Sequence, residues 1–154
     1  NAVTIPVIAA GGIATGKQML AAMVLGAEGV QMGSRFVASE EASSHINFKN
    51  AILSASEGDT KLMMKKLVPV RLMKNHFFEQ VQKVEDDGAT SETLKELLGR
   101  GRAKKGMFEG NLEDGELEIG QASALINNIL PAAGIVKNIY REFEQAITNP
   151  VKRK

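Results

Sequence analysis

The chain lacks several features that would assign it to a specialised class of protein. None of its 154 residues is cysteine, which excludes disulfide bonds and thiolate chemistry from this chain. No apolar run approaches the roughly 20 residues that a membrane helix needs. The formal net charge is only +1, so no global field attracts nucleic acid. The absence of cysteine fits a reducing compartment, and we expect a cytoplasmic protein.

Two common nucleotide-binding motifs are also missing. No G-x-G-x-x-G follows a strand, and no glycine-rich loop ends in the Gly-Lys-Ser/Thr of a P-loop. Two other glycine motifs are present, Ile5–Ile13 and Gly29–Phe36, and each is a short apolar strand that runs into a turn. The carboxyl ends of parallel strands open onto the ligand crevice, so we predict that both turns surround one phosphate group with backbone N–H donors. The expected donors are Gly11, Gly12, Gly33 and Ser34. The alternative is that both are only tight turns.

The residues around these motifs predict a β-α-β-α arrangement. A buried parallel strand is expected over Val3–Ala10, and a second strand over Val30–Met32. Between them, Thr15 and Gln18 form a capping box, and Gly26 is the natural stop of the helix. The side chains expected on the buried face of this helix are Met19, Leu20, Met23 and Val24.

Beyond residue 39 the pattern is mostly helical. Helices are expected over 43–56 (with Ile46, Ile52 and Leu53 inward), 75–85, 91–98 and 121–126, and from Pro131 onward. Ser91 is expected to cap the third of these, and Leu67–Met73 is expected to be extended. The last helix should bury Ile135, Ile139, Phe143 and Ile147.

One fold places a phosphate site after its last two strands, the (β/α)₈ barrel, with strands 7 and 8. That fold typically needs about 250 residues, and only two clean βα units are present here. We therefore predict an α/β chain that holds strands 7 and 8 of a TIM barrel, followed by a mostly helical C-terminal extension. The start at Asn1, close to a buried strand, also suggests a fragment of something longer.

The two glycine motifs, taken as Ile5–Ile13 and Gly26–Phe36, resemble the FMN phosphate region of the nitronate monooxygenase (2-nitropropane dioxygenase) family. Two later segments, Pro69–Asn75 and Glu118–Gln121, resemble the same family, and the likeness is closest to its flavin-dependent enoyl-acyl-carrier-protein reductase II branch. The resemblance covers nearly the whole chain but only the C-terminal half or less of a family member.

The resemblance implies an FMN-bearing barrel, often homodimeric, whose remaining barrel half would be this chain's partner. Residues 1–42 would hold the last βα units, residues 43–120 an inserted lid region, and residues 121–154 helices that return to the barrel. The implied FMN-binding residues are Gly11, Gly12, Ile13, Gln31, Met32, Gly33 and Ser34. Gln121 would approach the flavin or substrate side. No metal site is implied.

The implied chemistry is flavin-based. NAD(P)H would reduce FMN, which would then reduce an enoyl thioester carried by acyl carrier protein in fatty acid synthesis. The alternative is a nitronate monooxygenase that oxidises alkyl nitronates with O₂. Outside this class, a non-catalytic phosphate-binding module and a purely structural helical domain remain open. The family's catalytic histidine lies on an earlier strand that this chain lacks, so His45 and His76 are expected to be structural or solvated, and the isolated chain inactive with poor FMN binding.

Three further groups of residues have two interpretations each. Arg100–Lys105 is expected to be a solvated loop, with docking of an acidic carrier protein or a nucleotide phosphate as the alternative; a nucleic-acid site lacks aromatic support. Met63, Met64, Met73 and Phe77-Phe78 are expected in the core, with an acyl pocket as the alternative. Glu40-Glu41 and Asp86-Asp87 lack metal-ligand spacing and are expected to be exposed.

Overall fold

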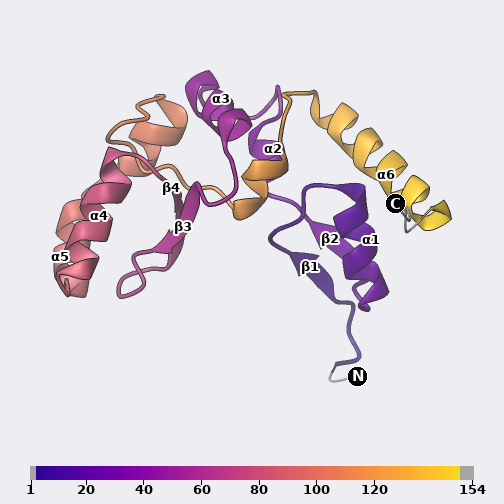
Figure 1. Cartoon of the computed structure of the whole chain (residues 1–154), viewed down its shortest axis with the longest axis horizontal. Helices are drawn as coiled ribbons and strands as arrows, with labels where there is room; N and C mark the ends of the chain where they lie inside the picture. Colours follow the sequence, from indigo (N-terminus) through magenta and orange to yellow (C-terminus); the bar gives the residue numbers. More distant parts are fainter. Residues whose placement is uncertain (1–2, 150–154) are drawn as a thin grey trace.

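The computed structural model describes residues 3–149 and has the shape of an arch with two lobes (Figure 1). Residues 1–2 and 150–154, which belong to the expected terminal regions, lie outside the described part. The first lobe contains β1 (Ile8–Ala10), α1 (Gly16–Val24), β2 (Gly29–Gln31) and α6 (Ala132–Thr148). The second contains β3 (Thr60–Met63), β4 (Val70–Met73), α4 (His76–Asp86) and α5 (Ser91–Leu98). The remaining elements are α2 (Ser34–Val37), α3 (Ile46–Ser54), the π-helix η1 (Lys104–Phe108) and the 3₁₀-helix η2 (Gln121–Leu125).

The predicted β-α-β unit is confirmed in the first lobe. Strands β1 and β2 pair in parallel, with Ile8 opposite Gly29. The capping box at the start of α1 is present, because the Thr15 hydroxyl accepts from the Gln18 N–H while the Gln18 side chain accepts from the Thr15 N–H. The helix ends before Gly26, whose φ of 104° lies in the left-handed region that glycine tolerates.

The first strand is shorter than its sequence predicts. The expected strand Val3–Ala10 forms ladder pairs only over Ile8–Ala10, because β2 is its only partner in the described sheet and is itself three residues long. The expected burial of Val24 is also wrong, since this side chain is 77% exposed. A helix face is buried only where another element covers it, and no described element covers this end of α1.

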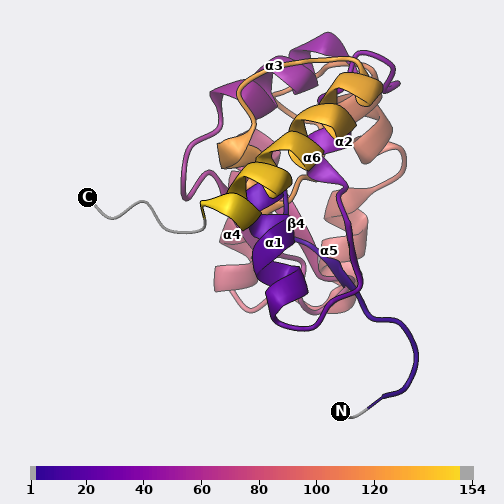
Figure 2. The same cartoon turned by 90° about the vertical axis from the view of Figure 1, so that its right-hand side faces the viewer.

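Helix α6 packs along α1 and completes the first lobe (Figure 2). Ile135 and Ile139 are buried, as their spacing predicts, but Ile147 is 53% exposed and the neighbouring Ala146 is buried instead. The two helices approach so closely at Gly16 that a Cβ there would collide with the carbonyl oxygen of Ile139. The Gly16 N–H donates to Glu142 at 2.9 Å, so α6 also caps the start of α1.

The second lobe is built on an antiparallel hairpin. The extended segment expected over Leu67–Met73 forms β4, and its partner β3, which the sequence pattern did not reveal, places Thr60 opposite Met73. Helix α5 is capped by the Thr90 hydroxyl rather than by Ser91, because Thr90 has the extended backbone that a cap requires.

The central elements confirm other expectations and correct one. Helix α3 lies within the predicted range 43–56 and buries Ile52, but Ile46 is 53% exposed, because it is the first residue of the helix. The 3₁₀-helix η2 and helix α6 occupy the places predicted from Gly120-Gln121 and Pro131.

Two buried clusters form the core. One joins α3, β4 and η2 around Phe48, Ile52 and Met73, and the other lies within the second lobe. Met63, Met64, Phe77 and Phe78 belong to the second cluster and are almost fully buried. The core interpretation of the methionine and phenylalanine residues is therefore confirmed.

Among the described residues, no helix is both long and apolar enough to span a membrane.

The contact at Gly16 generates a stability prediction. Gly16→Ala should lower the free energy of unfolding by about 1–3 kcal/mol, because the added methyl group must separate α1 from α6. Gly134→Ala in α6 is the control, since a Cβ there meets only ordinary contacts of 3.9 Å or more and should stabilise the helix. Urea unfolding of the full-length protein checks both variants. If Gly16→Ala had the same free energy of unfolding as the original protein, the packing argument would be contradicted.

Candidate functional site

The first glycine turn, Gly11–Ile13, follows β1 and is held by a side chain of α1. Gly11 and Gly12 have φ values of 87° and 72°, which side chains with a Cβ rarely adopt. The Gln18 Nε2 donates to the Gly12 carbonyl at 3.0 Å, and its Oε1 accepts from the Ala14 N–H at 2.9 Å. The turn is therefore pre-organised by the same glutamine that caps the helix.

The second glycine turn, Gly33-Ser34, follows β2 and opens α2. Gly33 is the N-cap residue with an ordinary φ of −94°, and no protein atom lies within 4 Å of where its Cβ would be. The Ser34 hydroxyl accepts a hydrogen bond from the Gly120 N–H at 3.0 Å. The hydroxyl proton of Ser34 remains able to donate to another acceptor.

Both turns present backbone donors that the protein does not use. Within residues 3–149, the N–H groups of Gly11, Gly12, Gly33 and Ser34 have no protein acceptor. Unused backbone donors at the ends of two adjacent parallel strands are able to donate to an anion. The structure thus brings two turns that are 20 residues apart in sequence to the same edge of a parallel sheet.

The glycines of the chain differ in the space beside them. Gly16, Gly106 and Gly115 are packed so tightly that a Cβ would collide with backbone atoms of neighbouring segments. Gly11 and Gly33 instead face open space. Gly33 needs neither an unusual backbone nor extra room for the protein's own packing, and the space beside its Cα is open.

The segment before η2 brings a further polar group to this site. Gly120 lies so close to α2 that a Cβ there would be 2.7 Å from the Ser34 Oγ. The next residue is Gln121, whose Nε2 lies 3.8 Å from where a Cβ on Gly12 would be. The structure therefore places Gln121 beside the first glycine turn.

A cavity of about 690 Å³ extends from the first glycine turn to the second lobe, and we call it the interlobe cavity. Gly12, Gln18 and Gln121 line one side of it, and Thr60 and Arg71 of the β3–β4 hairpin line the other. Its volume is within the range of small-molecule and cofactor sites. A second hollow, of about 320 Å³, is lined by Gly33, Ser34, Gly120 and again Arg71.

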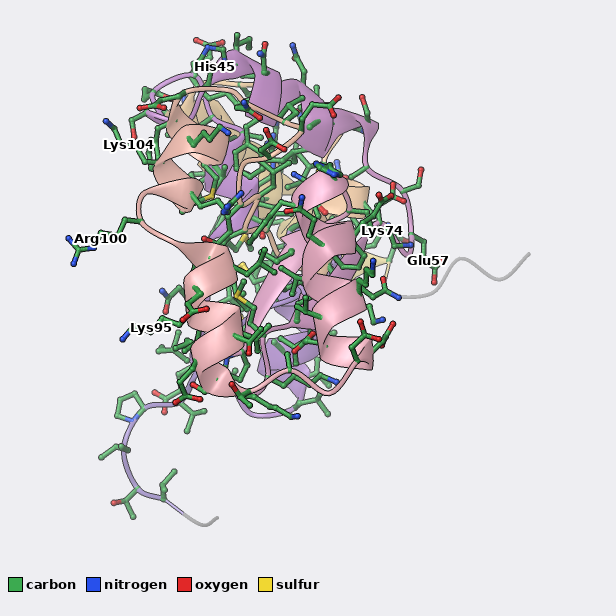
Figure 3. The ribbon with its side chains drawn as sticks, turned by 90° about the vertical axis from the view of Figure 1, so that its left-hand side faces the viewer. His45, Glu57, Lys74, Lys95, Arg100 and Lys104 are labelled. Atoms are coloured by element: carbon green, nitrogen blue, oxygen red, sulfur yellow. The ribbon has the colours of Figure 1, made fainter. Side chains whose placement is uncertain are left out.

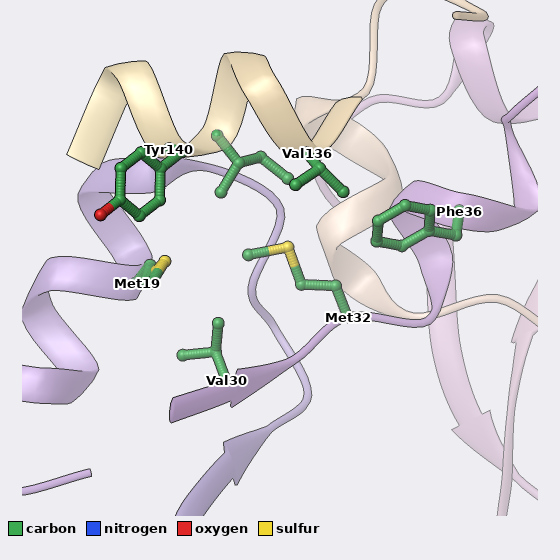
Figure 4. A pocket seen from close by; sticks show the side chains of 7 residues that line it. Met19, Val30, Met32, Phe36, Val136 and Tyr140 are labelled. Atoms are coloured by element: carbon green, nitrogen blue, oxygen red, sulfur yellow. The ribbon is translucent and has the colours of Figure 1, made fainter. Parts of the chain in front are cut away.

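The other residues expected to bind FMN lie beside this cavity rather than in it. Ile13 is buried, so only its backbone could reach a ligand, and Gln31 is exposed at the end of β2. Met32 lines a separate apolar cavity of about 220 Å³ between β2, α1, α2 and α6 (Figure 4). Its other side chains are Met19, Val30, Phe36, Val136, Ile139 and Tyr140. A role for Gln31 and Met32 stays a prediction.

Both histidines have structural contacts. His45 is the N-cap of α3, where its Nδ1 accepts from the Asn47 N–H at 3.1 Å (Figure 3 shows its place on α3). His76 begins α4, and its Nδ1 lies 3.0 Å from Asp114 Oδ1. Neither lines the interlobe cavity. The described residues contain no group of three or more side chains that could hold a metal ion.

The basic stretch Arg100–Lys105 is not the solvated loop that its composition predicts. The Arg102 guanidinium stacks on the Phe77 ring at 4.4 Å and donates to the carbonyl groups of Leu97, Leu98 and Asp114. Lys104 and Lys105 pair with Glu109 and Asp114, and helical structure begins at Arg102. Arg102 holds α5 and the π-helix against the second lobe, because a guanidinium can stack and donate several hydrogen bonds at once.

The four carboxylates expected to be exposed, Glu40, Glu41, Asp86 and Asp87, are all exposed. Glu41 has a structural contact in addition, because both of its carboxylate oxygens accept from the Ala132 N–H at the start of α6. This contact favours α6, since a negative charge stabilises a helix N-terminus.

Glu116 is a buried carboxyl group with an unusual environment. Its residue surface is 6% exposed, and burial raises its pKa to about 7, with a smaller contribution from the negative charge of Glu118. The positive charge of Arg102 acts in the opposite direction. Burial disfavours the charged form of a carboxyl group, so the ionised Glu116 destabilises the folded chain.

A model of the nitronate monooxygenase family matches residues 1–142. The chain belongs to the nitronate monooxygenase family. A probable nitronate monooxygenase of Staphylococcus aureus is 37% identical over 148 residues, which are 94% of this chain and 41% of that protein. One of Staphylococcus saprophyticus is 32% identical over 143 residues, 91% of this chain and 39% of that protein.

Two solved structures have a similar fold over nearly all of this chain. FabK from Thermotoga maritima is 40% identical with a TM-score of 0.88, over 96% of this chain and 47% of that one. A nitroalkane oxidase from Streptomyces ansochromogenes is 28% identical with a TM-score of 0.75, over 97% of this chain and 42% of that one.

The chain thus spans about two fifths of the length of the curated relatives it matches. It has the fold of part of a TIM barrel, with one parallel β-α-β unit and a mostly helical remainder. The predicted fold class, an α/β chain that forms part of a TIM barrel and continues into a mostly helical extension, is confirmed. The parallel pair β1–β2 is the barrel portion of the chain.

Two residues of the site were not recognised from sequence. Gln18 was assigned only a capping role, although it also holds the Gly12 carbonyl. Arg71 lies in the motif Pro69–Asn75, and no pattern in the sequence indicates that it lines the cavity. Its place depends on the β3–β4 pairing and on the approach of the two lobes.

The burial of Glu116 predicts a stability that falls with rising pH. The unfolded chain loses this proton near the ordinary value of 4.5 and the folded chain near 7, so stability from this group is lost as the pH rises from 4.5 to 7. Glu116→Gln should therefore stabilise the protein at pH 8 by on the order of 1–2 kcal/mol, allowing for solvent screening, and have little effect near pH 4.5.

Urea unfolding of the full-length protein at pH 5, 6, 7 and 8 tests this prediction. The matched control is Glu96→Gln on the exposed face of α5. An equal effect of Glu116→Gln at pH 5 and pH 8 would contradict the assignment.

Proposed function

We propose that this chain provides the phosphate-binding part of an FMN-dependent oxidoreductase. The observation that carries the proposal is the pair of glycine turns, whose four N–H groups have no acceptor among the described residues. The cavity beside them has the volume of a cofactor site. Membership in the nitronate monooxygenase family supports the same conclusion.

The residues present fit a flavin mononucleotide. A phosphate monoester needs several donors at close range, and glycine allows backbone N–H groups to approach it without a side chain between them. Gly33 meets this requirement most clearly, because the space where its Cβ would lie is open. The hydroxyl proton of Ser34 adds one side-chain donor.

The chain's own residues would bind and orient the cofactor. The two glycine turns would hold its phosphate, and Gln18 would keep the first turn in its binding shape. The Gln121 amide, next to Gly12, would contact the cofactor beside the first glycine turn. The flavin supplies the hydride-transfer chemistry, as cofactors generally do.

For the reaction, we propose NAD(P)H-dependent reduction of an enoyl group carried by acyl carrier protein, within a homodimeric protein. The support is the 40% identity to FabK together with a TM-score of 0.88. The alternative is oxidation of alkyl nitronates with O₂, which the names of the curated relatives favour.

One pair of assays on the flavin-loaded full-length protein separates these reactions. Under anaerobic conditions, an enoyl-thioester-dependent oxidation of NADH or NADPH is expected. In air, an alkyl nitronate should cause no O₂ uptake above background. If the alkyl nitronate causes O₂ uptake and the enoyl thioester causes no oxidation of NADH or NADPH, nitronate oxidation replaces enoyl reduction as the proposed reaction. If the protein binds no flavin, the proposed function is refuted.

The phosphate site predicts a specific defect for Gly33→Ala. The added methyl group should weaken FMN binding about 10-fold or more, because it enters the space in which the phosphate must approach the backbone. The free energy of unfolding of the flavin-free protein should stay within about 0.5 kcal/mol of its original value, since the methyl group meets no protein atom. Fluorescence titration with FMN and urea unfolding measure the two quantities.

Gly134→Ala is the control for this variant. It places the same methyl group on α6, where ordinary contacts surround it, and should leave FMN affinity unchanged. Undiminished FMN binding by Gly33→Ala would exclude the second glycine turn from the phosphate site.

A further inference from the structure

Arg71 lies where the interlobe cavity meets the hollow beside the second glycine turn. It belongs to β4 and lines both of these spaces. One space contains Gly12 and Gln121, and the other contains Gly33 and Ser34. Arg71 is the only basic residue that lines either of them within the described part of the chain.

The hydrogen bonds of Arg71 hold one end of its guanidinium and leave the rest available. Its Nη1 donates to the Thr60 carbonyl at 3.1 Å and to the Thr60 Oγ1 at 3.3 Å. Among residues 3–149, no carboxylate lies within 4 Å of it, although Glu57 and Glu118 line the same two spaces. The Nε and Nη2 groups therefore keep donors for a ligand, and β3 limits the movement of the side chain.

The glycine turns supply only neutral donors to an anion. A phosphate monoester carries between one and two negative charges near neutral pH, and burying it beside neutral groups alone is costly. A guanidinium matches the geometry of phosphate oxygens and keeps its charge. Arg71 is the group in the described site that can meet this need.

We propose that Arg71 of the second lobe is a phosphate-binding residue, which supplies the positive charge for the anionic group held at the two glycine turns. The proposal deepens the proposed function and rests on it where the anion is the FMN phosphate. The same chemistry would bind the phosphate of a second substrate, such as a nicotinamide dinucleotide. In either case, ligand binding joins the β3–β4 hairpin to the first lobe.

The competing role for Arg71 is purely structural, as a link between β4 and Thr60. A structural residue would affect all ligands equally and would not respond to their charge. The test therefore compares FMN with riboflavin, which has the same ring system but no phosphate. It also compares low and high salt, because a charge–charge contact weakens as salt screens it.

The variants are Arg71→Gln and Arg71→Lys, with Arg100→Gln as the matched control in the full-length protein. Arg100 is exposed and points away from the ribbon (Figure 3). Arg71→Gln should weaken FMN binding about 10- to 100-fold, as expected for loss of a charged hydrogen bond, and leave riboflavin binding unchanged. Arg71→Lys should weaken FMN binding less than Arg71→Gln does. The salt dependence of FMN binding should be smaller in Arg71→Gln than in the original protein. Arg100→Gln should behave like the original protein.

Each other outcome is decisive. Unchanged FMN binding with a raised KM for the phosphate-bearing substrate alone would support Arg71 as the phosphate-binding residue and identify that substrate as the source of the anion. Equal losses for FMN and riboflavin, or no change in any ligand parameter, would overturn the proposal. If the original protein binds no flavin, the proposed function fails separately, and Arg71 is tested with inorganic phosphate by calorimetry. Equal phosphate affinity of the original protein and Arg71→Gln would then overturn it.

Discussion

The close crossing of α1 and α6 at Gly16 is the contact on which the candidate site depends. Only a residue without a Cβ lets the two backbones approach so closely, and Glu142 uses that approach to accept the first N–H of α1. The start of α1 is thereby held in place, and Gln18 of its first turn can fix the Gly12 carbonyl. A contact between residues 126 positions apart thus helps to set the shape of the first glycine turn.

A second constraint joins the lobes. Leu117 accepts from the Met73 N–H and Ile119 donates to the Arg71 carbonyl, so the segment before η2 extends the β3–β4 hairpin. Its next residue, Gly120, donates to Ser34 at the second glycine turn. One short segment therefore contacts both the barrel portion and the hairpin. The interlobe cavity exists because this segment spans the two lobes, which explains how Arg71 comes to lie beside turns from a different part of the chain.

Features with a local cause could be predicted from sequence. The capping box of α1, the stop at Gly26 and the β-α-β order all follow from residues within a few positions of each other. Expectations about burial were less accurate. Val24 and Ile147 have the right spacing for a buried helix face, but burial requires a covering element, and the described chain has none at these places. The charge of Arg102 suggested a solvated loop, although its planar guanidinium is used to pack on Phe77.

The sequence by itself determined the β-α-β unit, most of the helices and the two glycine turns, because turn chemistry and helix capping act over a few residues. It also carried the family likeness, which the family match over residues 1–142 confirms. Only the tertiary structure decided which glycines serve packing and which leave space for a ligand, since that depends on what surrounds each Cα. It likewise decided that Arg71 and Gln121 lie at the cavity, because their positions depend on contacts between segments that are distant in the chain.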